Sequence, residues 1–146
     1  MSKIVFLSMQ RNSVDEFIAI HKIDNNAIML INTSAIYEIY RDLDDGKTNV
    51  HLLTPDGCSK SVKTNESVEM IFNSIKKNIG QFILLHTRGD NKPYVLNKSN
   101  INKVTIPKDG NTKSSAVYPH MQYGNGTPNC GVLVSENIQQ ILNKLK

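Results

Sequence analysis

The sequence of 146 residues lacks the motifs that mark several functional classes. It has only two cysteines, Cys58 and Cys130, with no Cys-X-X-Cys pair and no histidine at zinc-finger spacing, which excludes a conventional zinc site. Two free thiols are the default in a reducing compartment, and a disulfide between them requires that their Cβ atoms meet. The P-loop, Gly-X-Ser-X-Gly and His-Glu-X-X-His motifs are also absent. We therefore expect no metal, no cofactor and no enzymatic activity.

Long apolar runs are missing as well. The apolar run at residues 4–7 is too short for a signal peptide, and no segment approaches the length that spans a membrane. The sequence therefore predicts a cytoplasmic protein without a membrane partner. The bias towards Asn, Lys and Ile is typical of AT-rich genomes, including those of many phages. If a phage encodes the protein, we expect it in the host cytoplasm.

Charge of either sign is not strongly in excess. Seventeen basic and thirteen acidic residues give a formal charge of +4. This balance favours an anionic partner such as a nucleotide or a nucleic acid, and it is explained equally well by solubility. No carboxylate occurs between Gly110 and Ser135.

A repeated stretch is the main feature that the sequence does contain. Residues 17–21 (FIAIH) recur as residues 82–86 (FILLH), and the same shift of 65 relates Asn32 to Asn97. Near the end of each copy, residues 66–75 recur as residues 136–145 with a shift of 70. The second copy has therefore gained a net five residues, and such repeats decide the fold class before any other pattern does.

The repeat predicts a mainly β (α+β) fold built by tandem duplication. Each copy is expected to be a small curved β-sheet or barrel followed by a C-terminal helix, with a pseudo-twofold relation between the copies. The expected units are an N-terminal strand or arm (1–15), repeat one (16–79) and repeat two (80–146), with the two repeats packed as one unit. Strands are predicted at residues 3–9, 16–23, 27–31, 35–41, 49–53, 60–63, 81–87, 94–97 and 101–106. Their unpaired outer edges predict a homo-oligomer.

A change of period marks the two helices. Apolar residues recur at i, i+3, i+4 and i+7 from Val68, and the same stripe returns from Ile138. We expect Thr64 or Asn65 to cap the first helix and Gly80 to end it. Ser135 is the expected cap of the second.

Two motifs of the first copy carry a resemblance to a known family. Ile31-Asn32 opens a turn after a strand, and residues 62–69 (VKTNESVE) close the copy. In these motifs the segment 17–76 resembles the FlbD-like family of short flagellar and phage-associated proteins, with one additional residue in the closing motif and only an outline match in the second copy. The resemblance implies a small β-plus-helix module with a binding or regulatory role, and it implies no catalytic residue.

Four histidines form two pairs that the repeat relates. His21 matches His86 with the shift of 65, and His51 lies 69 residues before His120. Such pairs suggest a metal or acid–base site, whereas the structural alternative is that histidines at strand ends mark a shared turn. A Cys–His catalytic pair also stays open, although nothing in the sequence joins a particular histidine to either cysteine.

The inserted stretch, residues 118–130, is the principal candidate site. Long loops on a rigid scaffold often bind ligands; here aromatic and histidine side chains can stack on a base, and glycines let backbone N–H groups approach a phosphate. Arg41 and Arg88 are the expected phosphate partners. The alternative is an ordinary hairpin with its turn at residues 124–126 and both tyrosines in the core. The candidate ligand-binding residues are Arg41, His86, Arg88, Tyr118, His120, Tyr123, Gly124, Asn125 and Gly126.

Three functions are compatible with these features. The first is a non-catalytic protein that binds and sequesters a small anionic ligand such as a cyclic nucleotide, as a phage-encoded sponge for nucleotide immune signals would. The second is a nucleic-acid-binding regulator, whose affinity would fall steeply with salt. The third is a structural or interaction module of a virion or motility apparatus.

Overall fold

The computed structural model describes residues 13–53, 59–120 and 131–146, and it confirms a mainly β fold. The first half, residues 16–79, contains strands β1 (Phe17–His21), β2 (Ile28–Asn32), β3 (Ile36–Arg41), β4 (Thr48–Leu53) and β5 (Ser59–Thr64), and then helix α2 (Val68–Ser74). The second half, residues 80–146, contains β6 (Phe82–His86), β7 (Pro93–Asn97), β8 (Ile101–Thr105), β9 (Ser115–Pro119) and β10 (Val132–Val134), and then helix α3 (Ile138–Leu145). The strand predicted at residues 3–9 lies outside the described residues.

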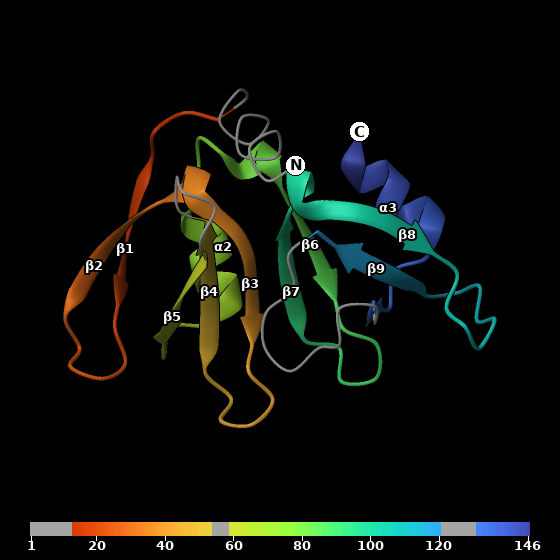
Figure 1. The fold of residues 1–146 in the computed structure, drawn as a ribbon, viewed down its shortest axis with the longest axis horizontal. Helices are drawn as coiled ribbons and strands as arrows, with labels where there is room; N and C mark the ends of the chain where they lie inside the picture. The colour runs from red at the N-terminus through yellow and green to blue at the C-terminus, as the bar shows by residue number, and fades with distance from the viewer. Residues whose placement is uncertain (1–12, 54–58, 121–130) are drawn as a thin grey trace.

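The described strands form three open antiparallel sheets, and the expected barrel is not among them. The largest sheet has the order β5-β4-β3-β7-β6, a second has the order β10-β9-β8, and β1 pairs only with β2. The barrel prediction is wrong because β2 and β8 each keep one edge without a partner in the described part of the chain, so that no ring of strands closes. Figure 1 shows β1 and β2 at one end of the molecule and β8 and β9 at the other.

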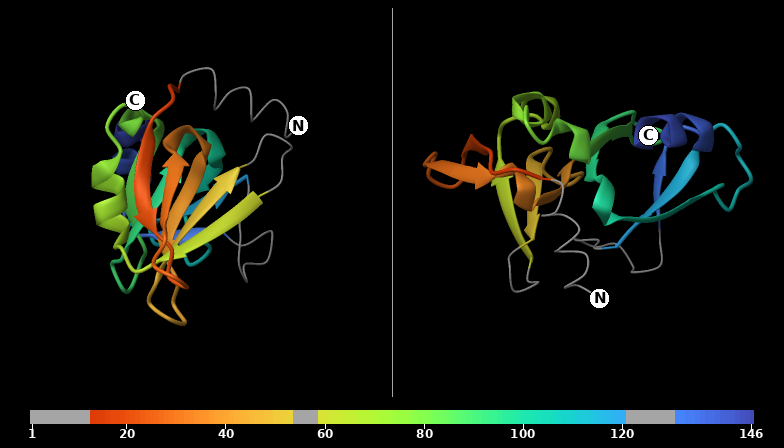
Figure 2. Two further views of the ribbon diagram at one scale, coloured as in Figure 1. Left: turned by 90° about the vertical axis from the view of Figure 1, so that its left-hand side faces the viewer. Right: turned by 90° about the horizontal axis from the view of Figure 1, so that it is seen from above.

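The two halves are joined through the largest sheet. Strand β7 of the second half pairs antiparallel with β3 of the first, in the register Glu38–Leu96, Ile39–Val95 and Tyr40–Tyr94. The hairpin β6–β7 therefore extends a sheet that begins in the other half of the chain. Seen from above in Figure 2, helices α2 and α3 lie on the same side of the molecule.

Each half has its own hydrophobic core, and the hairpin β6–β7 contributes to both. Alternate residues of a strand point to opposite faces. On one face, Phe82 and Val95 join the first core, which holds Val50 and Ile71; on the other face, Leu85 and its neighbours join the second core around Val117 and Ile141. The hairpin is thus buried on both faces.

Short turns recur at the same places in each half. The side chain of Asn32 accepts a hydrogen bond from the backbone N–H of Ser34, and Asn97 does the same for Ser99. Each asparagine starts a 3-10 turn, η1 (Thr33–Ala35) or η3 (Lys98–Asn100). Asparagine bonds readily to the main chain two residues further on, which explains the Asn-X-Ser pattern of the sequence.

Both helices begin later than the sequence predicts. The cap of α2 is Ser67, whose hydroxyl accepts from the N–H of Met70, because the predicted cap Thr64 is the last residue of β5. The cap of α3 is Asn137, which forms a capping box with Gln140. The predicted cap Ser135 instead donates its backbone N–H to the carbonyl of His86.

Helix α2 also ends at Ser74, six residues before Gly80. The carboxylate of Glu16 accepts hydrogen bonds from the backbone N–H groups of Lys76 and Lys77, both at 2.8 Å, and of Asn78 at 3.2 Å. These donors would otherwise bond to carbonyls four residues earlier and continue the helix. Burial opposes the ionisation of Glu16, but these hydrogen bonds and that from Thr33 outweigh it and lower its pKa.

Neither α2 nor α3, nor any other helix in the described part of the chain, has the length and apolar character that a membrane-spanning helix requires.

Candidate functional site

A cavity of about 550 Å³ lies where the two halves meet. Two turns form its rim: the β3–β4 turn of the first half and the β6–β7 turn of the second. Strands β3, β7 and β10 complete it. Its lining residues are Glu38, Tyr40, Arg41, Asp42, Leu43, Asp44, Thr87, Arg88, Asp90, Lys92, Pro93, Tyr94 and Val132. Pairing of β3 with β7 brings these turns to the same end of one sheet.

The β3–β4 turn is fixed by its aspartates. One oxygen of Asp42 accepts from the N–H of Asp44 at 2.8 Å, and the ammonium of Lys63 lies 2.6 Å from Asp45 and 3.4 Å from Asp42. Gly46, at φ 70°, supplies the left-handed backbone that closes the turn. The Asp44 N–H lowers the pKa of Asp42, and Lys63 lowers that of Asp45.

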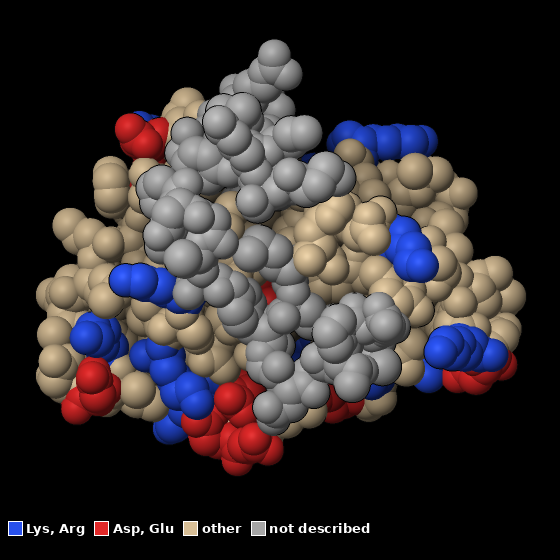
Figure 3. All heavy atoms as spheres, in the orientation of Figure 1, with Lys and Arg blue, Asp and Glu red and all other residues tan. Residues whose placement is uncertain are grey.

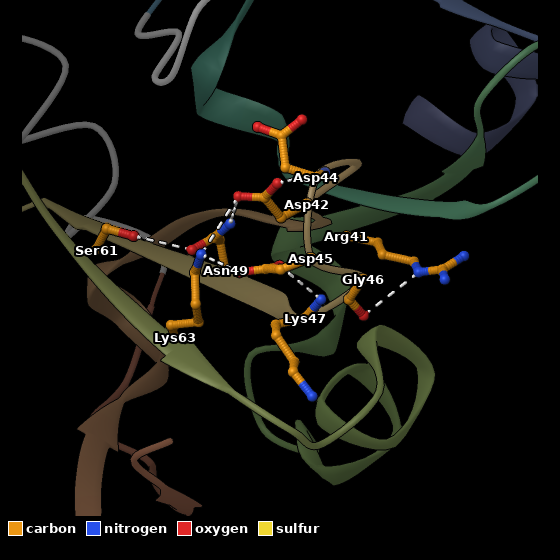
Figure 4. Close-up of polar contacts among 9 residues, drawn as sticks. All are labelled: Arg41, Asp42, Asp44, Asp45, Gly46, Lys47, Asn49, Ser61 and Lys63. Carbon is orange, nitrogen blue, oxygen red and sulfur yellow. Dashed lines mark hydrogen bonds and ion pairs between the residues drawn. The ribbon is translucent and has the colours of Figure 1, made fainter. Parts of the chain in front are cut away.

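Arg41 lies at the start of this turn but takes no part in its ion pairs. Its guanidinium Nε is 3.4 Å from the carbonyl oxygen of Gly46. In Figure 4 its side chain points away from the group formed by Asp42, Asp45 and Lys63. Arg41 is exposed and, within the described part of the chain, forms no ion pair. Its charge is therefore available to a ligand in the cavity.

The β6–β7 turn holds a second arginine. Arg88 forms an ion pair with Asp109 at 2.9 Å and donates to the hydroxyl of Ser114 at 3.1 Å. The backbone N–H of Arg88 donates to the carbonyl of Leu133, which ties the turn to β10. Lys92, also in the lining, is half-buried and forms no ion pair among the described residues.

A buried polar group forms the wall of the cavity. The hydroxyl of Tyr94 donates to one oxygen of Glu38, and the other oxygen of Glu38 lies 3.1 Å from Nδ1 of His51. These three side chains are at most 3% exposed. Burial, and then the Glu38 charge, raises the pKa of Tyr94 well above its ordinary value, and the same two causes raise the pKa of the half-buried Tyr40.

The cavity therefore presents charges of both signs together with apolar surface. Its cations are Arg41, Lys92 and Arg88, the last already paired with Asp109. Its carboxylates are those of the buried Glu38, of Asp42, and of Asp44 and Asp90, which are exposed at its rim. Such a lining suits a ligand that has an anionic group and also hydrogen-bond donors. No protein-family model matches the chain, and no curated protein matches it.

The predicted site residues are divided by the structure. Arg41 and Arg88, which are 47 positions apart in the sequence, lie in the lining of one cavity, and His86, Tyr118 and His120 do not belong to that lining. The remaining candidates, Tyr123, Gly124, Asn125 and Gly126, lie outside the described residues.

Two of the candidates outside the lining have structural contacts. The Tyr118 ring, in β9, has the ammonium of Lys103 at 4.7 Å from its centroid on one side and Gly131 against it on another. A Cβ atom at position 131 would lie 2.9 Å from that ring. His120 is exposed and donates its backbone N–H to the carbonyl of Asn100.

The strand-end histidines have equivalent surroundings. The Nδ1 atom of His21 lies 3.5 Å from Glu66, and that of His86 lies 2.8 Å from Glu136. Each backbone N–H of these histidines also donates to the same glutamate, which ties a strand end to the start of a helix. Among the described residues no group of three potential metal ligands occurs.

His51 does not match His120 in the structure. His51 pairs with Glu38 across β3 and β4, and the corresponding pair across β8 and β9 is Lys103 with Tyr118. The predicted pairing of His51 with His120 is therefore wrong by two residues. The reason is that the connection between the paired positions is longer in the second half by two residues only, and the rest of the insertion lies after β9.

Of the thirteen lining residues, sequence analysis named only Arg41 and Arg88; Tyr40, Lys92 and Tyr94 are among those it missed. Tyr40 and Tyr94 are directly opposite each other in the β3–β7 pairing. No local sequence pattern predicts a contact between strands so far apart in the chain. Lys92 occupies a turn position at which the first half has Ala27. A comparison of positions related by the shift of 65 would have drawn attention to this difference.

Proposed function

We propose that the protein binds a small anionic nucleotide in the cavity between the β3–β4 and β6–β7 turns and sequesters it without chemical change. One observation carries this proposal: Arg41, Arg88 and Lys92 line a single cavity of about 550 Å³. Small-molecule sites have volumes of roughly 300–1,000 Å³. Guanidinium groups bind phosphate with two parallel hydrogen bonds, and a lysine adds a point charge.

The mixed charge of the lining favours a nucleotide over a simple phosphate. Asp44 and Asp90 can accept hydrogen bonds from ribose hydroxyls or from the amino group of a base. Leu43, Pro93 and Val132 supply apolar surface for a base. A ligand that used only the cations would leave these carboxylates close to its own negative charge, which costs free energy.

The Glu38 group supports binding rather than catalysis. A general base must be able to reach a substrate proton with a free lone pair. Both carboxylate oxygens of Glu38 are engaged, one by Tyr94 and one facing His51. This group is therefore better suited to hold β3, β4 and β7 in register behind the cavity than to abstract a proton.

A nucleic acid fits this surface less well. Binding to a phosphate backbone uses a basic stripe or groove that follows the strand. On the face seen in Figure 3, basic side chains are dispersed, and a group of Asp and Glu lies at the position of the β3–β4 turn. These carboxylates would repel successive phosphates.

The tandem duplication and the pseudo-twofold relation of the halves are part of the proposal. Both halves have five strands and a helix in the same order. The Asn-X-Ser turns, the His–Glu contacts at strand ends and a left-handed asparagine, Asn26 or Asn91 at φ 55°, recur in each. A duplicated β-plus-helix module also agrees with the resemblance to the FlbD-like family, for which an interaction module of a virion or motility apparatus is the second candidate function.

Mass spectrometry of material released from the heated protein, together with thermal-shift measurements against cyclic and linear nucleotides, tests the proposed ligand. We expect a released nucleotide or a raised Tm with at least one compound. Arg41→Gln should weaken its binding roughly ten- to a hundredfold, since a hydrogen bond to a charged group contributes about 1.5–3 kcal/mol.

Lys60→Gln is the matched control. Lys60 is exposed on β5 and lies outside the cavity lining. Its substitution removes one positive charge, as Arg41→Gln does. It should leave the affinity unchanged within about twofold. No released compound together with no Tm shift across the panel would reject the ligand class, and equal losses in both variants would reject the cavity as its site.

A further inference from the structure

The two hairpins of the chain differ in what covers their outer faces. In β6–β7 the outer face carries Phe82 and Val95, which are 5% and 0% exposed. The positions related to them by the shift of 65 are Phe17 and Leu30 in β1–β2, which are 61% and 67% exposed. The first hairpin also exposes Ile28, at 65%. An apolar strand face of this kind is unusual on a protein surface unless a partner covers it.

The inner face of the first hairpin is already in use. Ile18, Ile20 and Ile31 are buried in the first core, as their counterparts in β6–β7 are buried in the second. The hairpin therefore has one satisfied face and one open face. Within the described part of the chain, the open face and the outer edges of β1 and β2 are left to receive a partner. Of these two strands, β2 is the counterpart of β7, the strand that pairs with β3.

At the other end of the molecule, strand β8 has an edge that pairs with no described strand, and helix α3 exposes apolar residues. In the first half, β3 has partners on both edges, β4 and β7, whereas β8 pairs only with β9 in the described part of the chain. Helix α3 exposes Ile138 (41%) and Leu142 (47%), and the residue of α2 that corresponds to Ile138, Val68, is 3% exposed. In the first half, α2 contacts the added strand β7. Among the described strands, none pairs with the edge of β8 opposite β9, the place that β7 has beside β3.

We infer that β2 of one chain pairs antiparallel with β8 of a second copy of the same chain, so that the open hairpin completes the second core of its neighbour. This inference rests on the tandem duplication proposed above and not on the proposed ligand. The pairing of β7 with β3 inside one chain is its template. The shift of 65 converts that register into Lys103–Ile31, Val104–Leu30 and Thr105–Met29.

A second copy fits these surfaces better than another protein does, because one chain carries both halves of the contact. Strand β2 contains no charge and no proline, the devices by which exposed edges normally avoid pairing. The one charge of β8, on Lys103, lies over Tyr118 of its own sheet. Val104, the partner assigned to Leu30, is a half-buried member of the second core, and Leu30 would complete its burial.

The contact must form between chains. Figures 1 and 2 place β2 and β8 at opposite ends of the molecule, with the five-stranded sheet between them. Because the two edges differ, the interface is heterologous, and copies add head to tail, forming a ring if the rotation between them closes and an open filament if it does not.

Light scattering coupled to size-exclusion chromatography tests the assembly. We expect the unchanged protein to have a multiple of the single-chain mass at micromolar concentration, and Leu30→Arg to have the mass of one chain with an unchanged circular-dichroism spectrum. Met70→Arg is the matched control, since Met70 is 61% exposed on α2 and lies outside the inferred contact. A single-chain mass for the unchanged protein, or an oligomer that Leu30→Arg leaves intact, overturns the inference.

Disulfide trapping tests the register. With Cys58→Ser and Cys130→Ser as background, Leu30→Cys and Val104→Cys chains are co-expressed and oxidised. We expect an interchain dimer, and a weaker one when Ile28→Cys replaces Leu30→Cys. Equal or absent bands overturn the register.

The two proposals fail separately. Assembly without nucleotide binding removes only the proposed ligand. Nucleotide binding by a protein that stays a single chain removes only the assembly.

Discussion

Hairpins β1–β2 and β6–β7 show how one sequence pattern can have two fates. Both alternate apolar residues on two faces, and the first strand of each ends at a histidine whose backbone N–H and ring contact a glutamate. The second hairpin is buried on both faces because it lies against β3 and α2 of the other half. In the described part of the chain the first hairpin pairs with no other strand, and Phe17, Ile28 and Leu30 on its outer face are exposed. The burial of a strand therefore depends on the elements that pack against it and not on its own residues alone.

The same contrast explains where the cavity lies. A junction between halves occurs once within the described part of the chain, at β3 and β7, and the cavity lies at that junction. Its polar residues have no chemical counterparts at the other potential junction: the positions related to Glu38, Tyr40 and Tyr94 hold Lys103, Thr105 and Met29. If chains assemble as inferred, the second type of junction would be structural and only the first would hold a ligand.

The largest difference in stability should come from placing a carboxylate at equivalent positions of the two hairpins. Val95→Asp places a carboxylate at a position that is 0% exposed, and we expect a loss of about 3–5 kcal/mol in the free energy of unfolding, as for an unpaired buried charge. Leu30→Asp, at the equivalent exposed position, should leave the stability of one chain within about 0.5 kcal/mol. Urea denaturation at low protein concentration measures both. Similar losses would show that the two hairpins are equally buried.

A smaller effect should distinguish the two cross-strand pairs behind and beside the cavity. Glu38→Ala removes the partner of the buried Tyr94 hydroxyl and opens a void, which we expect to cost about 2 kcal/mol. Lys103→Ala, at the equivalent position, removes an exposed contact with Tyr118 and should cost less than about 1 kcal/mol. The difference between their urea midpoints checks this. A larger cost for Lys103→Ala would contradict the assignment of the Glu38 group as the scaffold.

The smallest effect should be the loss of thermal stability at low pH. It arises from carboxylates in two turns, the β3–β4 turn and the turn between β8 and β9. The pKa values of Asp42 and Asp45 are lowered in the folded chain by the Asp44 N–H and by Lys63, and that of Asp109 by the Asn111 N–H and by Arg88. A lowered folded pKa stabilises the fold above the unfolded value of about 3.9, and this contribution is lost as the pH falls through the folded pKa. Tm should therefore fall as the pH is lowered from about 5 to 3.

Substitution of these aspartates identifies the turn responsible. Asp42→Asn with Asp45→Asn should flatten the pH dependence of Tm more than Asp109→Asn does, because two lowered carboxylates are removed instead of one. An unchanged slope in the double variant would contradict the role of the β3–β4 turn. Asp45 and Asp109 are exposed and Asp42 is half-buried, so that salt should weaken the effect.

Much of the secondary structure was predictable because it depends on neighbours in the sequence. The turn at residues 24–26, the Asn-X-Ser motifs and the helical stripes from Val68 and Ile138 predicted the strands and the helix of the first half, and β6, β7, β8 and α3 of the second. No range was predicted for β9 or β10. The helix caps were predicted wrongly, since Thr64 is held in β5 opposite Thr48 and Ser135 bonds to His86. Several residues able to cap a helix lie close together in the sequence before each helix. Contacts with neighbouring strands decide which of them is the cap.

For the candidate site, the sequence by itself singled out Arg41 and Arg88 by their chemistry, but it gave no reason for them to meet. Only the pairing of β3 with β7 brings them to one cavity, together with Lys92 and Tyr94. The physical reason is that side-chain alternation is written into each strand, whereas the partner of a strand edge is selected by how whole sheets and helices bury their apolar faces. The identity of each element was thus local, and the open sheets, the junction and the exposed hairpin were decided by tertiary structure.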